Sequence, residues 1–369
     1  NGSEKELIGA GYKRVGKNFP VFLHPTTKEE YALARTEKKE GLGHRGFSID
    51  ASMGITLEED LARRDFTINA IAKDSTGKIF DPFGGIQDIE RKTLRHITDA
   101  FRDDPLRVLR GARFSATLGF KIAEETHGLM LDMVKSGELK SLSVERIERE
   151  LRLAIAGRQP NYFFETLKKC EAISQLFPEL DLPQLYNADD PIFQALSNFQ
   201  ERDRMAEERF IVFLTRSGNY GLHKNGEKIQ ITNLIERLKL NRRTAETYAM
   251  YRDFNEKIVN YAHLNEQDIL HLFEEMDAFR RPETFTRLLE ILGHIIEPVK
   301  SSNHVKELTK FFMKALSETS KLSARSFFTN EEITKTHYST ISKRLRTERA
   351  KKIRETIIKH RAGLKSVDE

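Results

Sequence analysis

The spacing of apolar residues changes near residue 100, and this change restricts the fold class more than any other feature of the chain. Before it, strand-like runs at 19–24 and 31–35 flank residues 25–28, which predict a hairpin. After it, apolar residues recur with helical period in 106–114, 229–240, 268–276 and 283–296. The sequence therefore predicts an α+β protein, with a small mixed α/β head followed by an elongated, mostly α-helical part.

Changes in composition divide the 369 residues into four parts. Residues 181–191, with two prolines and an Asn-Ala-Asp-Asp stretch, are the best linker candidate. Three glycines within 41–46 predict a flexible connection. We expect a head at 1–100, a helical neck at 101–180, a helical body at 181–300 and a basic helical tail at 301–369.

Several classes of protein are excluded by composition. No run of about 18 apolar residues is present, so no membrane-spanning helix is expected. Cys170 is the only cysteine, which leaves it without a disulfide partner, excludes a cysteine-based zinc module and fits a reducing cytoplasm. The eleven histidines are scattered and include no His-Asp step, so no metal site is predicted among them. The sequence does not indicate an oligomeric state.

The net charge of +5 is concentrated at one end of the chain. Between Lys343 and Arg361, nine basic residues accompany two acidic ones. Leu345, Ile353 and Ile357 form an apolar stripe that would dock this helix. The basic residues form either a solvated helix face or a contact to an RNA phosphate backbone. The residues expected to bind RNA are Lys343, Arg344, Arg346, Arg349, Lys351, Lys352 and Arg354.

Polar residues cluster in a stretch that we expect to be helical. Thr56 and Glu59 have the spacing of a capping box and predict a helix running towards Ala72. On that helix Asp65 and Asn69, four residues apart, would share a face, beside Arg64. A guanidinium here could grip a phosphate while the other two suit ribose hydroxyls. The alternative is an intrahelical ion pair with a capping asparagine.

A second cluster begins at the next predicted helix. Asp104 suits its N-cap and Pro105 its first turn. Arg107, Arg110 and Arg113 then lie within an arc of about 120°. Three cations on one side repel each other unless an anion such as a nucleotide phosphate meets them, although a solvated arginine row is the alternative. No glycine-rich phosphate loop is present, so a phosphate site would be made of side chains.

Taken together, these motifs resemble the bacterial tRNA nucleotidyltransferases. These are the CCA-adding enzymes of the class that includes eubacterial poly(A) polymerases, in the DNA polymerase beta superfamily. The resemblance is strong over about residues 5–180 and weaker to the end. It is carried by the stretches 7–12, 15–25, 29–37, 63–70, 81–85, 94–96, 103–114 and 143–146. The runs at 19–25 and 31–37 are more similar to the CCA-adding branch than to the poly(A) polymerases.

The resemblance implies a nucleotidyltransferase head and template-independent transfer of CMP and AMP from CTP and ATP to the 3′ end of tRNA. It implies that Arg64, Arg110 and Arg113 hold the triphosphate and sugar. Asp65 and Asn69 would lie by the ribose.

The same resemblance assigns base selection to Asp104 and Arg107, which match the pair that reads the Watson–Crick edge of the incoming base. A carboxylate that accepts and a guanidinium that donates can match cytosine or adenine. The first residue of the family's Glu-Asp-x-x-Arg motif is Asp103 here, outside the proposed pair.

Two family features are missing. The family holds two Mg²⁺ ions on an Asp-x-Asp pair, which we expect upstream of Asn1 because the chain lacks an initiator methionine and the match begins abruptly. The catalytic residues are therefore unassigned, and this chain is expected to transfer nucleotides weakly or not at all. Thr215-Arg-Ser-Gly218 replaces a His-Asp-Leu-Gly signature, which predicts a degenerate phosphohydrolase-like region without that activity.

Two alternatives remain open. One is an enzyme of the same chemistry that adds only A or poly(A). The other, from a different class, is a non-catalytic RNA-binding module that kept the nucleotide and tRNA surfaces.

Overall fold

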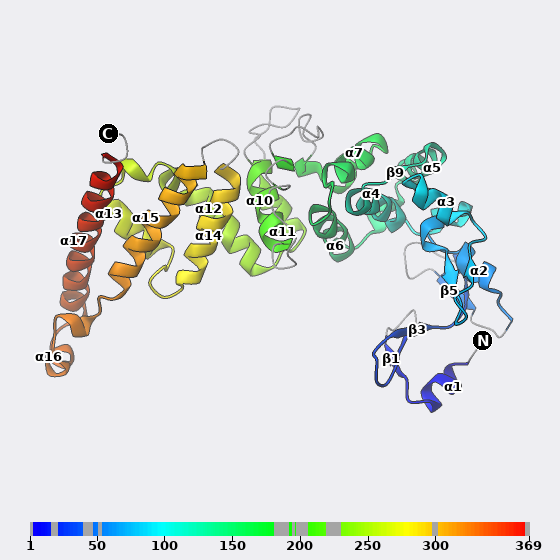
Figure 1. Cartoon of the computed structure of the whole chain (residues 1–369), viewed down its shortest axis with the longest axis horizontal. Coiled ribbons are helices and arrows are strands. Elements are labelled where there is room, and N and C mark those ends of the chain that lie inside the picture. Colours follow the sequence, from blue (N-terminus) through cyan, green and yellow to red (C-terminus); the bar gives the residue numbers. More distant parts are fainter. Residues whose placement is uncertain are drawn as a thin grey trace. The chain divides into compact units, whose positions relative to one another are not determined.

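The computed structural model describes residues 3–15, 21–39, 47–50, 54–180, 192–193, 196, 206–218, 230–296 and 302–365 (Figure 1). The expected glycine-rich connection at 41–46 and linker at 181–191 lie outside the described residues. The chain forms two compact units. Unit 1 comprises Asn1–Ala188 and Leu222–Lys239, and unit 2 comprises Asp189–Gly221 and Leu240–Glu369. The four-part division of the chain stays a prediction.

The first part of unit 1 contains short strands. Its first elements are α1 (Glu4–Gly9), β1 (Lys13–Val15), β2 (Val21–Leu23), β3 (Glu30–Ala32), β4 (Thr36–Lys39) and β5 (Phe47–Asp50). Among them, β2 and β3 lie where the sequence predicts strand-like runs. β1, β2 and β3 form an antiparallel sheet, and β4 pairs with β5. The predicted hairpin at 25–28 is confirmed, because Val21 pairs with Ala32 and Leu23 with Glu30 across it.

The remainder of unit 1 is increasingly helical. Its next elements are α2 (Leu57–Ala62), η1 (Thr67–Asn69), β6 (Ala72–Lys73), β7 (Ile79–Phe80), α3 (Gly85–Glu90), β8 (Thr93–Leu94), η2 (Asp99–Asp103), α4 (Leu106–Leu118), β9 (Lys121–Ile122), α5 (Glu124–Lys135), η3 (Glu138–Ser141), α6 (Val144–Ile155), α7 (Asn161–Lys169), α8 (Ile173–Leu176), η4 (Pro178–Leu180) and α11 (Ile231–Arg237). α4 packs against both α6 and α7 (Figure 1). Leu109 and Ala112 are fully buried, as the apolar spacing of 106–114 predicts.

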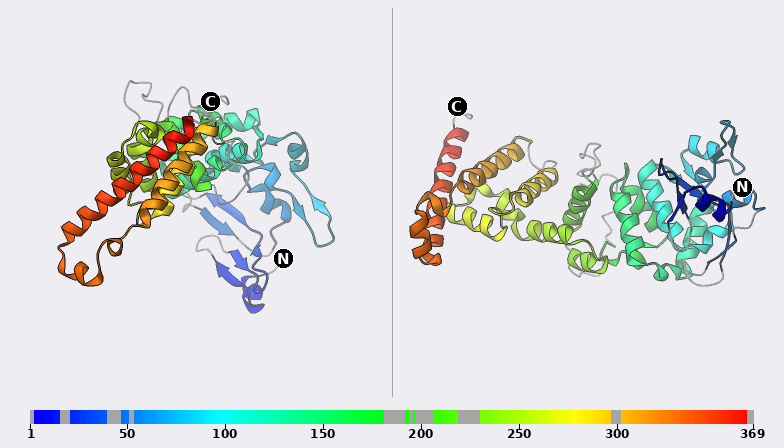
Figure 2. Two further views of the ribbon diagram at one scale, coloured as in Figure 1. Left: turned by 60° about the vertical axis from the view of Figure 1, so that its left-hand side comes forward. Right: turned by 90° about the horizontal axis from the view of Figure 1, so that it is seen from below.

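Unit 2 is helical throughout its described part. It contains α10 (Ala206–Gly218), α12 (Arg242–Val259), η6 (Tyr261–His263), α13 (Glu266–Glu275), α14 (Pro282–Ile296), α15 (Ser302–Ser320), η7 (Ala324–Ser326), α16 (Asn330–Lys335) and α17 (Tyr338–Lys365). Phenylalanines including Phe273, Phe285 and Phe312 fill its core with edge-to-face contacts. The long helix α17 packs on α13 and α15, which are labelled in Figure 1, and Figure 2 shows α17 in red from two further sides.

The α+β class is confirmed. All described strands lie before residue 123, and the described elements after it are all helical. Among the described residues, no helix is both long enough and apolar enough to cross a membrane.

Candidate nucleotide-binding site

The stretch 63–70 leaves the helix that the sequence predicts. The capping box of α2 is confirmed, because Thr56 Oγ1 accepts a hydrogen bond from Glu59 N–H at 3.2 Å. The helix nevertheless ends at Ala62, and its predicted continuation towards Ala72 is wrong. Phe66 forms an isolated β-bridge with His96 and is fully buried. Burial of this ring outweighs the local helical preference and turns the polar residues on either side of it away from a common helix face.

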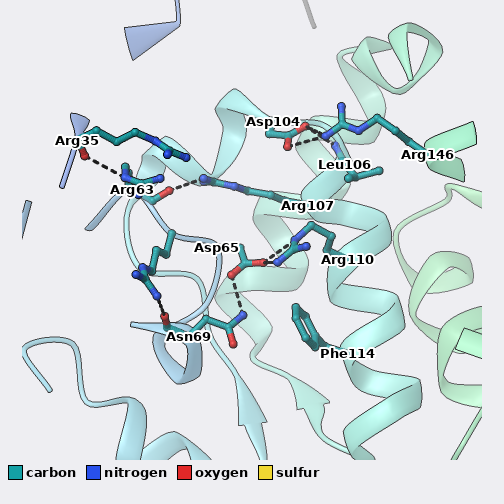
Figure 3. A pocket seen from close by; sticks show the side chains of 11 residues that line it. Arg35, Arg63, Asp65, Asn69, Asp104, Leu106, Arg107, Arg110, Phe114 and Arg146 are labelled. Atoms are coloured by element: carbon teal, nitrogen blue, oxygen red, sulfur yellow. Dashed lines mark hydrogen bonds and ion pairs between the residues drawn. The ribbon is translucent and has the colours of Figure 1, made fainter. Parts of the chain in front are cut away.

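The stretch 63–70 and helix α4 provide most of the lining of a cavity of about 600 Å³ in unit 1 (Figure 3). Six of the lining residues are arginines and two are aspartates, so the wall is strongly positive. Planar guanidinium groups match phosphate oxygens in pairs, so a wall of this composition suits a polyphosphate. The lining residues are Arg35, Arg63, Arg64, Asp65, Asn69, Asp104, Leu106, Arg107, Arg110, Phe114 and Arg146.

Asp65 lies at the buried side of this cavity and holds two predicted site residues. Its carboxylate accepts a hydrogen bond from Arg110 Nε at 2.7 Å and from Asn69 Nδ2 at 2.8 Å. Burial raises the pKa of the Asp65 carboxyl, but Arg110, Asn69 and the Phe66 N–H outweigh burial and hold that pKa below its ordinary value. The expected proximity of Asp65 and Asn69 therefore exists, although it is made by a turn and η1 instead of a helix face.

Asp104 and Arg107 both line the cavity, and each has its own anchors. Asp104 has an extended backbone and accepts a hydrogen bond at 3.0 Å from the N–H of Leu106, the first residue of α4. The N-cap itself is Pro105, one residue later than the sequence predicts. Its carboxylate also accepts from Arg146 Nη2 at 3.1 Å. Arg107 donates to the carbonyl oxygens of Ala100, at 2.8 Å, and of Arg63 (Figure 3).

Arg64 and Arg113 differ in where they lie. Arg64 is at the rim, with 42% of its side chain exposed, and donates to the carbonyl oxygen of Asn69 at 2.9 Å. Arg113 is not among the lining residues. Its Nε donates to Glu150 Oε2 at 2.5 Å, and its guanidinium lies 4.0 Å from the centre of the Phe114 ring. The structure thus brings six of the seven predicted nucleotide-binding residues together and directs Arg113 elsewhere.

Sequence reasoning missed five lining residues: Arg35, Arg63, Leu106, Phe114 and Arg146. All five lie within stretches that carry the family resemblance, at 29–37, 63–70, 103–114 and 143–146, but the sequence assigned them no role. Arg35 reaches the cavity only through tertiary structure, which brings it beside Arg63.

The described residues do not fit a metal centre. They contain no group of three or more His, Cys, Asp or Glu side chains placed to hold a metal ion. The two cavity carboxylates are already paired with arginines, Asp65 with Arg110 and Asp104 with Arg146. The two-Mg²⁺ site that the resemblance implies therefore has no ligand set among the described residues.

Helix α17 carries the basic residues predicted to bind RNA. Ile353 and Ile357 of the expected apolar stripe are buried and Leu345 is half-buried, so the stripe docks the helix within unit 2. A groove of about 490 Å³ runs beside the start of the helix. It is lined by Gln267, Tyr338, Ser339, Ser342, Lys343, Arg346 and Thr347.

Most of the basic residues on α17 have partners within unit 2. Ion pairs join Arg344 to Glu348, Arg346 to Glu274, Lys352 to Glu355 and Arg354 to Glu266. Arg349 lies 3.7 Å from the centre of the Phe279 ring, and burial lowers its pKa. Within the described part of the chain, Lys343 and Lys351 have no ion-pair partner. The helix therefore offers fewer uncompensated charges than its sequence indicates.

Cys170 lies apart from the cavity lining and is fully buried. Its Sγ is 3.5 Å from His127 Nδ1, and burial raises the pKa of the thiol to about 12.

Comparison with known proteins identifies the family. Residues 10–95 match the family model described as the poly A polymerase head domain, and residues 119–182 match the probable RNA and SrmB-binding site of polymerase A. A multifunctional CCA protein of Shewanella frigidimarina is 41% identical over 310 residues, covering 78% of this chain and 75% of the relative. The chain belongs to the bacterial CCA-adding tRNA nucleotidyltransferases.

Other members support the same assignment. The multifunctional CCA protein of Tolumonas auensis is 41% identical over 312 residues, covering 78% of this chain and 76% of its own length. The crystal structure of the Bacillus stearothermophilus CCA-adding enzyme in complex with CTP has a TM-score of 0.61 and 20% identity, covering 91% of this chain and 78% of that one. At that identity the likeness shows the fold, and it confirms the tRNA nucleotidyltransferase fold that the sequence motifs predict.

Proposed function

We propose that this protein adds CMP and AMP, taken from CTP and ATP, to the 3′ end of tRNA with release of pyrophosphate. The observation that carries the proposal is the arginine-walled cavity of unit 1, in a chain that belongs to the CCA-adding family. Its wall supplies cations for a triphosphate and paired donors and acceptors for a base. Both are needed by an enzyme that selects nucleotides without a template.

Base selection is assigned to Asp104 and Arg107. Cytosine and adenine each present an amino donor beside a ring-nitrogen acceptor. A carboxylate can accept from the amino group while a guanidinium donates to the ring nitrogen, so one pair of side chains can serve both bases. Arg146 and the carbonyl oxygens of Ala100 and Arg63 hold this pair before a nucleotide enters. Because these side chains are already held in place, less side-chain entropy is lost when a nucleotide binds.

Triphosphate and sugar binding is assigned to the remaining predicted residues. Arg64 and Arg110 extend from the turn and from α4 into the same cavity, so their guanidinium groups can contact one polyphosphate. Asp65 and Asn69 provide polar atoms for the ribose hydroxyls. Arg113 enters this set by resemblance alone, and it would need to exchange Glu150 for a phosphate.

tRNA is the proposed macromolecular partner, and α17 is its proposed contact in unit 2. Tyr338 is 81% exposed at the groove that Lys343 and Arg346 also line, which places an aromatic face beside cationic groups. Stacking and phosphate contacts of this kind are typical of RNA-binding surfaces. Use of Mg²⁺ is an expectation that rests on the family resemblance. A cytoplasmic location is an expectation that rests on the single cysteine of the sequence.

The function is tested by incubating the protein with Mg²⁺, a tRNA lacking its terminal CCA, and CTP or ATP, singly and together. Because the described residues hold no ligand set for Mg²⁺, we expect incorporation to be weak, with CMP added from CTP alone and CCA completed when both nucleotides are present. AMP incorporation without CMP would favour the A-adding or poly(A) alternative. Binding of tRNA and nucleotides without incorporation of either would favour the RNA-binding module.

A further inference from the structure

Asp60 is a buried carboxylate that lies beside the cavity but does not line it. It is on α2 and only 7% exposed. Its Oδ1 accepts hydrogen bonds from Arg63 Nη2 at 2.7 Å, from Arg63 Nε at 3.1 Å and from Arg35 N–H at 3.2 Å. Its Oδ2 lies 3.4 Å from Arg64 Nη2. One carboxylate is therefore shared by three arginine residues that line the cavity.

Through Arg63, these contacts connect Asp60 to Arg107, one of the two residues assigned to base selection. Arg63 Nε also donates to the carbonyl oxygen of Arg35 at 2.9 Å, so Asp60, Arg35 and Arg63 form a closed set of hydrogen bonds. The carbonyl oxygen of Arg63 accepts from Arg107 Nη2 (Figure 3). The position of that carbonyl, and with it one of the anchors of Arg107, depends on where Asp60 holds Arg63.

Asp60 also contacts Arg64, one of the residues assigned to the triphosphate. Its guanidinium is held between Asp60 and the carbonyl oxygen of Asn69. Without Asp60, this half-exposed side chain would keep a single described anchor and would sample more rotamers. An arginine side chain with more freedom loses more entropy when it binds a phosphate.

We propose that Asp60 is a positioning residue that sets the orientation of Arg107 and Arg64 together, and so couples base selection to triphosphate affinity. This inference rests on the proposed function of the cavity. Asp60 makes no contact with the nucleotide in this role. Its removal therefore acts on both ends of the ligand through the arginines.

The test compares the full chain with Asp60→Asn, which keeps the shape of the side chain and removes its charge. Equilibrium dialysis measures the Kd values of CTP, ATP and UTP. We expect binding of CTP and ATP to weaken by at least about tenfold, as for loss of a hydrogen bond to a charged group. The preference for CTP over UTP should also fall. A variant that is merely less stable would bind less nucleotide at unchanged preference.

Asp88→Asn is the matched control. Asp88 is 4% exposed, accepts a hydrogen bond from Thr67 Oγ1 at 2.7 Å and pairs with Arg95. This control loses a buried carboxylate and some stability, and we expect its CTP-to-UTP preference to stay unchanged. Equal loss of preference in both variants, or an unchanged preference in folded Asp60→Asn, overturns the inference.

Two additions keep the test decisive. If Asp60→Asn does not fold, Asp60→Glu retains the charge on a longer side chain, and a shifted preference is then expected from displaced arginines. An unchanged preference in Asp60→Glu would count against the inference. If the wild-type chain binds no nucleotide, the proposed function fails, and the inference is judged by NMR of the arginine Nε–H groups. The Arg64 and Arg107 signals should still move in the Asp60 variant and not in Asp88→Asn, and unmoved signals overturn it.

Discussion

The arginines of the unit 1 cavity and the basic residues of α17 differ in how the protein holds them. In the cavity, the guanidinium groups contact the buried carboxylates of Asp60 and Asp65 and backbone carbonyl oxygens. On α17, most basic side chains pair with partly exposed glutamates such as Glu274 and Glu355. Buried anchors fix a cation in one geometry, whereas exposed ion pairs contribute little to stability and leave the cation at the surface. The first arrangement suits selection of a small ligand, and the second suits contact with a long polyanion.

The largest effect is expected when a buried anchor loses its partner. Arg110→Ala leaves Asp65, which is 6% exposed, without its guanidinium, and we expect a loss of about 3 kcal/mol in the free energy of unfolding. Nucleotide binding should be lost as well. Urea unfolding and equilibrium dialysis measure both effects. Arg102→Ala, which breaks the exposed pair with Asp132, is the control and should cost less than about 1 kcal/mol. Equal losses would contradict the contrast between buried and exposed ion pairs.

A second large effect is expected from the backbone beneath the cavity. A Cβ at Gly85 would lie 2.2 Å from the Thr67 carbonyl oxygen, so Gly85→Ala must displace the segment that carries Asp65 and Asn69. We expect the free energy of unfolding to fall by about 2 kcal/mol and nucleotide binding to weaken. Gly128→Ala on α5 is the control, because its Cβ would meet no atom within 4 Å. Alanine also favours the helix, so the free energy of unfolding should rise by up to about 1 kcal/mol. Thermal unfolding and dialysis distinguish the two.

The ion pair at Asp65 predicts an intermediate, pH-dependent effect. The folded pKa of Asp65 is below its ordinary value, so its stabilising contribution is present above the unfolded pKa and is lost as pH falls through the folded pKa. Below about pH 4, the wild-type free energy of unfolding should fall more steeply than that of Asp65→Asn, by up to about 1.4 kcal/mol per pH unit. Urea unfolding at several acidic pH values measures the slopes. Parallel slopes would show that Asp65 carries no such ion pair.

On α17, the expected effect is on RNA affinity. The double variant Lys343→Ala and Lys351→Ala removes cations that have no ion-pair partner among the described residues, so tRNA binding should weaken several-fold. The slope of log affinity against log salt should fall by about 2. Lys352→Ala with Arg354→Ala is the matched pair, and it should change the slope less because both cations are already paired with glutamates. Filter binding across salt concentrations measures the slopes. Equal changes would mean that the internal pairs do not limit RNA contact.

The smallest effect is expected on the stability of unit 2. Glu266→Gln breaks the pair with Arg354, whose side chain is 66% exposed, and should change the free energy of unfolding by less than about 1 kcal/mol. Urea unfolding measures the change. A loss near that of Arg110→Ala would remove the distinction drawn between the two regions.

Local patterns predicted the parts of the fold that local interactions determine. Two examples are the hairpin at 25–28 and the capping box at Thr56 and Glu59, which depend on residues a few positions apart. The end of α2 was not predictable in this way, because it depends on the bridge between Phe66 and His96, thirty residues along the chain.

The candidate site shows the same limit. Periodicity grouped Arg107, Arg110 and Arg113 on one side of α4, but Glu150 on α6 draws Arg113 away from the cavity. Arg146 and Arg35 line the cavity only because α6 and the chain after β3 pack beside it. Charge signs and motif order were visible in the sequence, whereas the partner of each charge required tertiary structure.

The burial of Cys170 has a practical consequence for measuring motion in this protein. A fully buried thiol with a pKa of about 12 stays protonated at neutral pH, and the thiolate is the form that reacts with maleimides. The wild-type chain therefore provides an unreactive background for cysteine labelling. One cysteine introduced on an exposed position of each unit, for example at Lys135 and at Lys335, would accept a donor and an acceptor dye. Energy transfer between the dyes would then report the distance between the two units as nucleotide and tRNA bind.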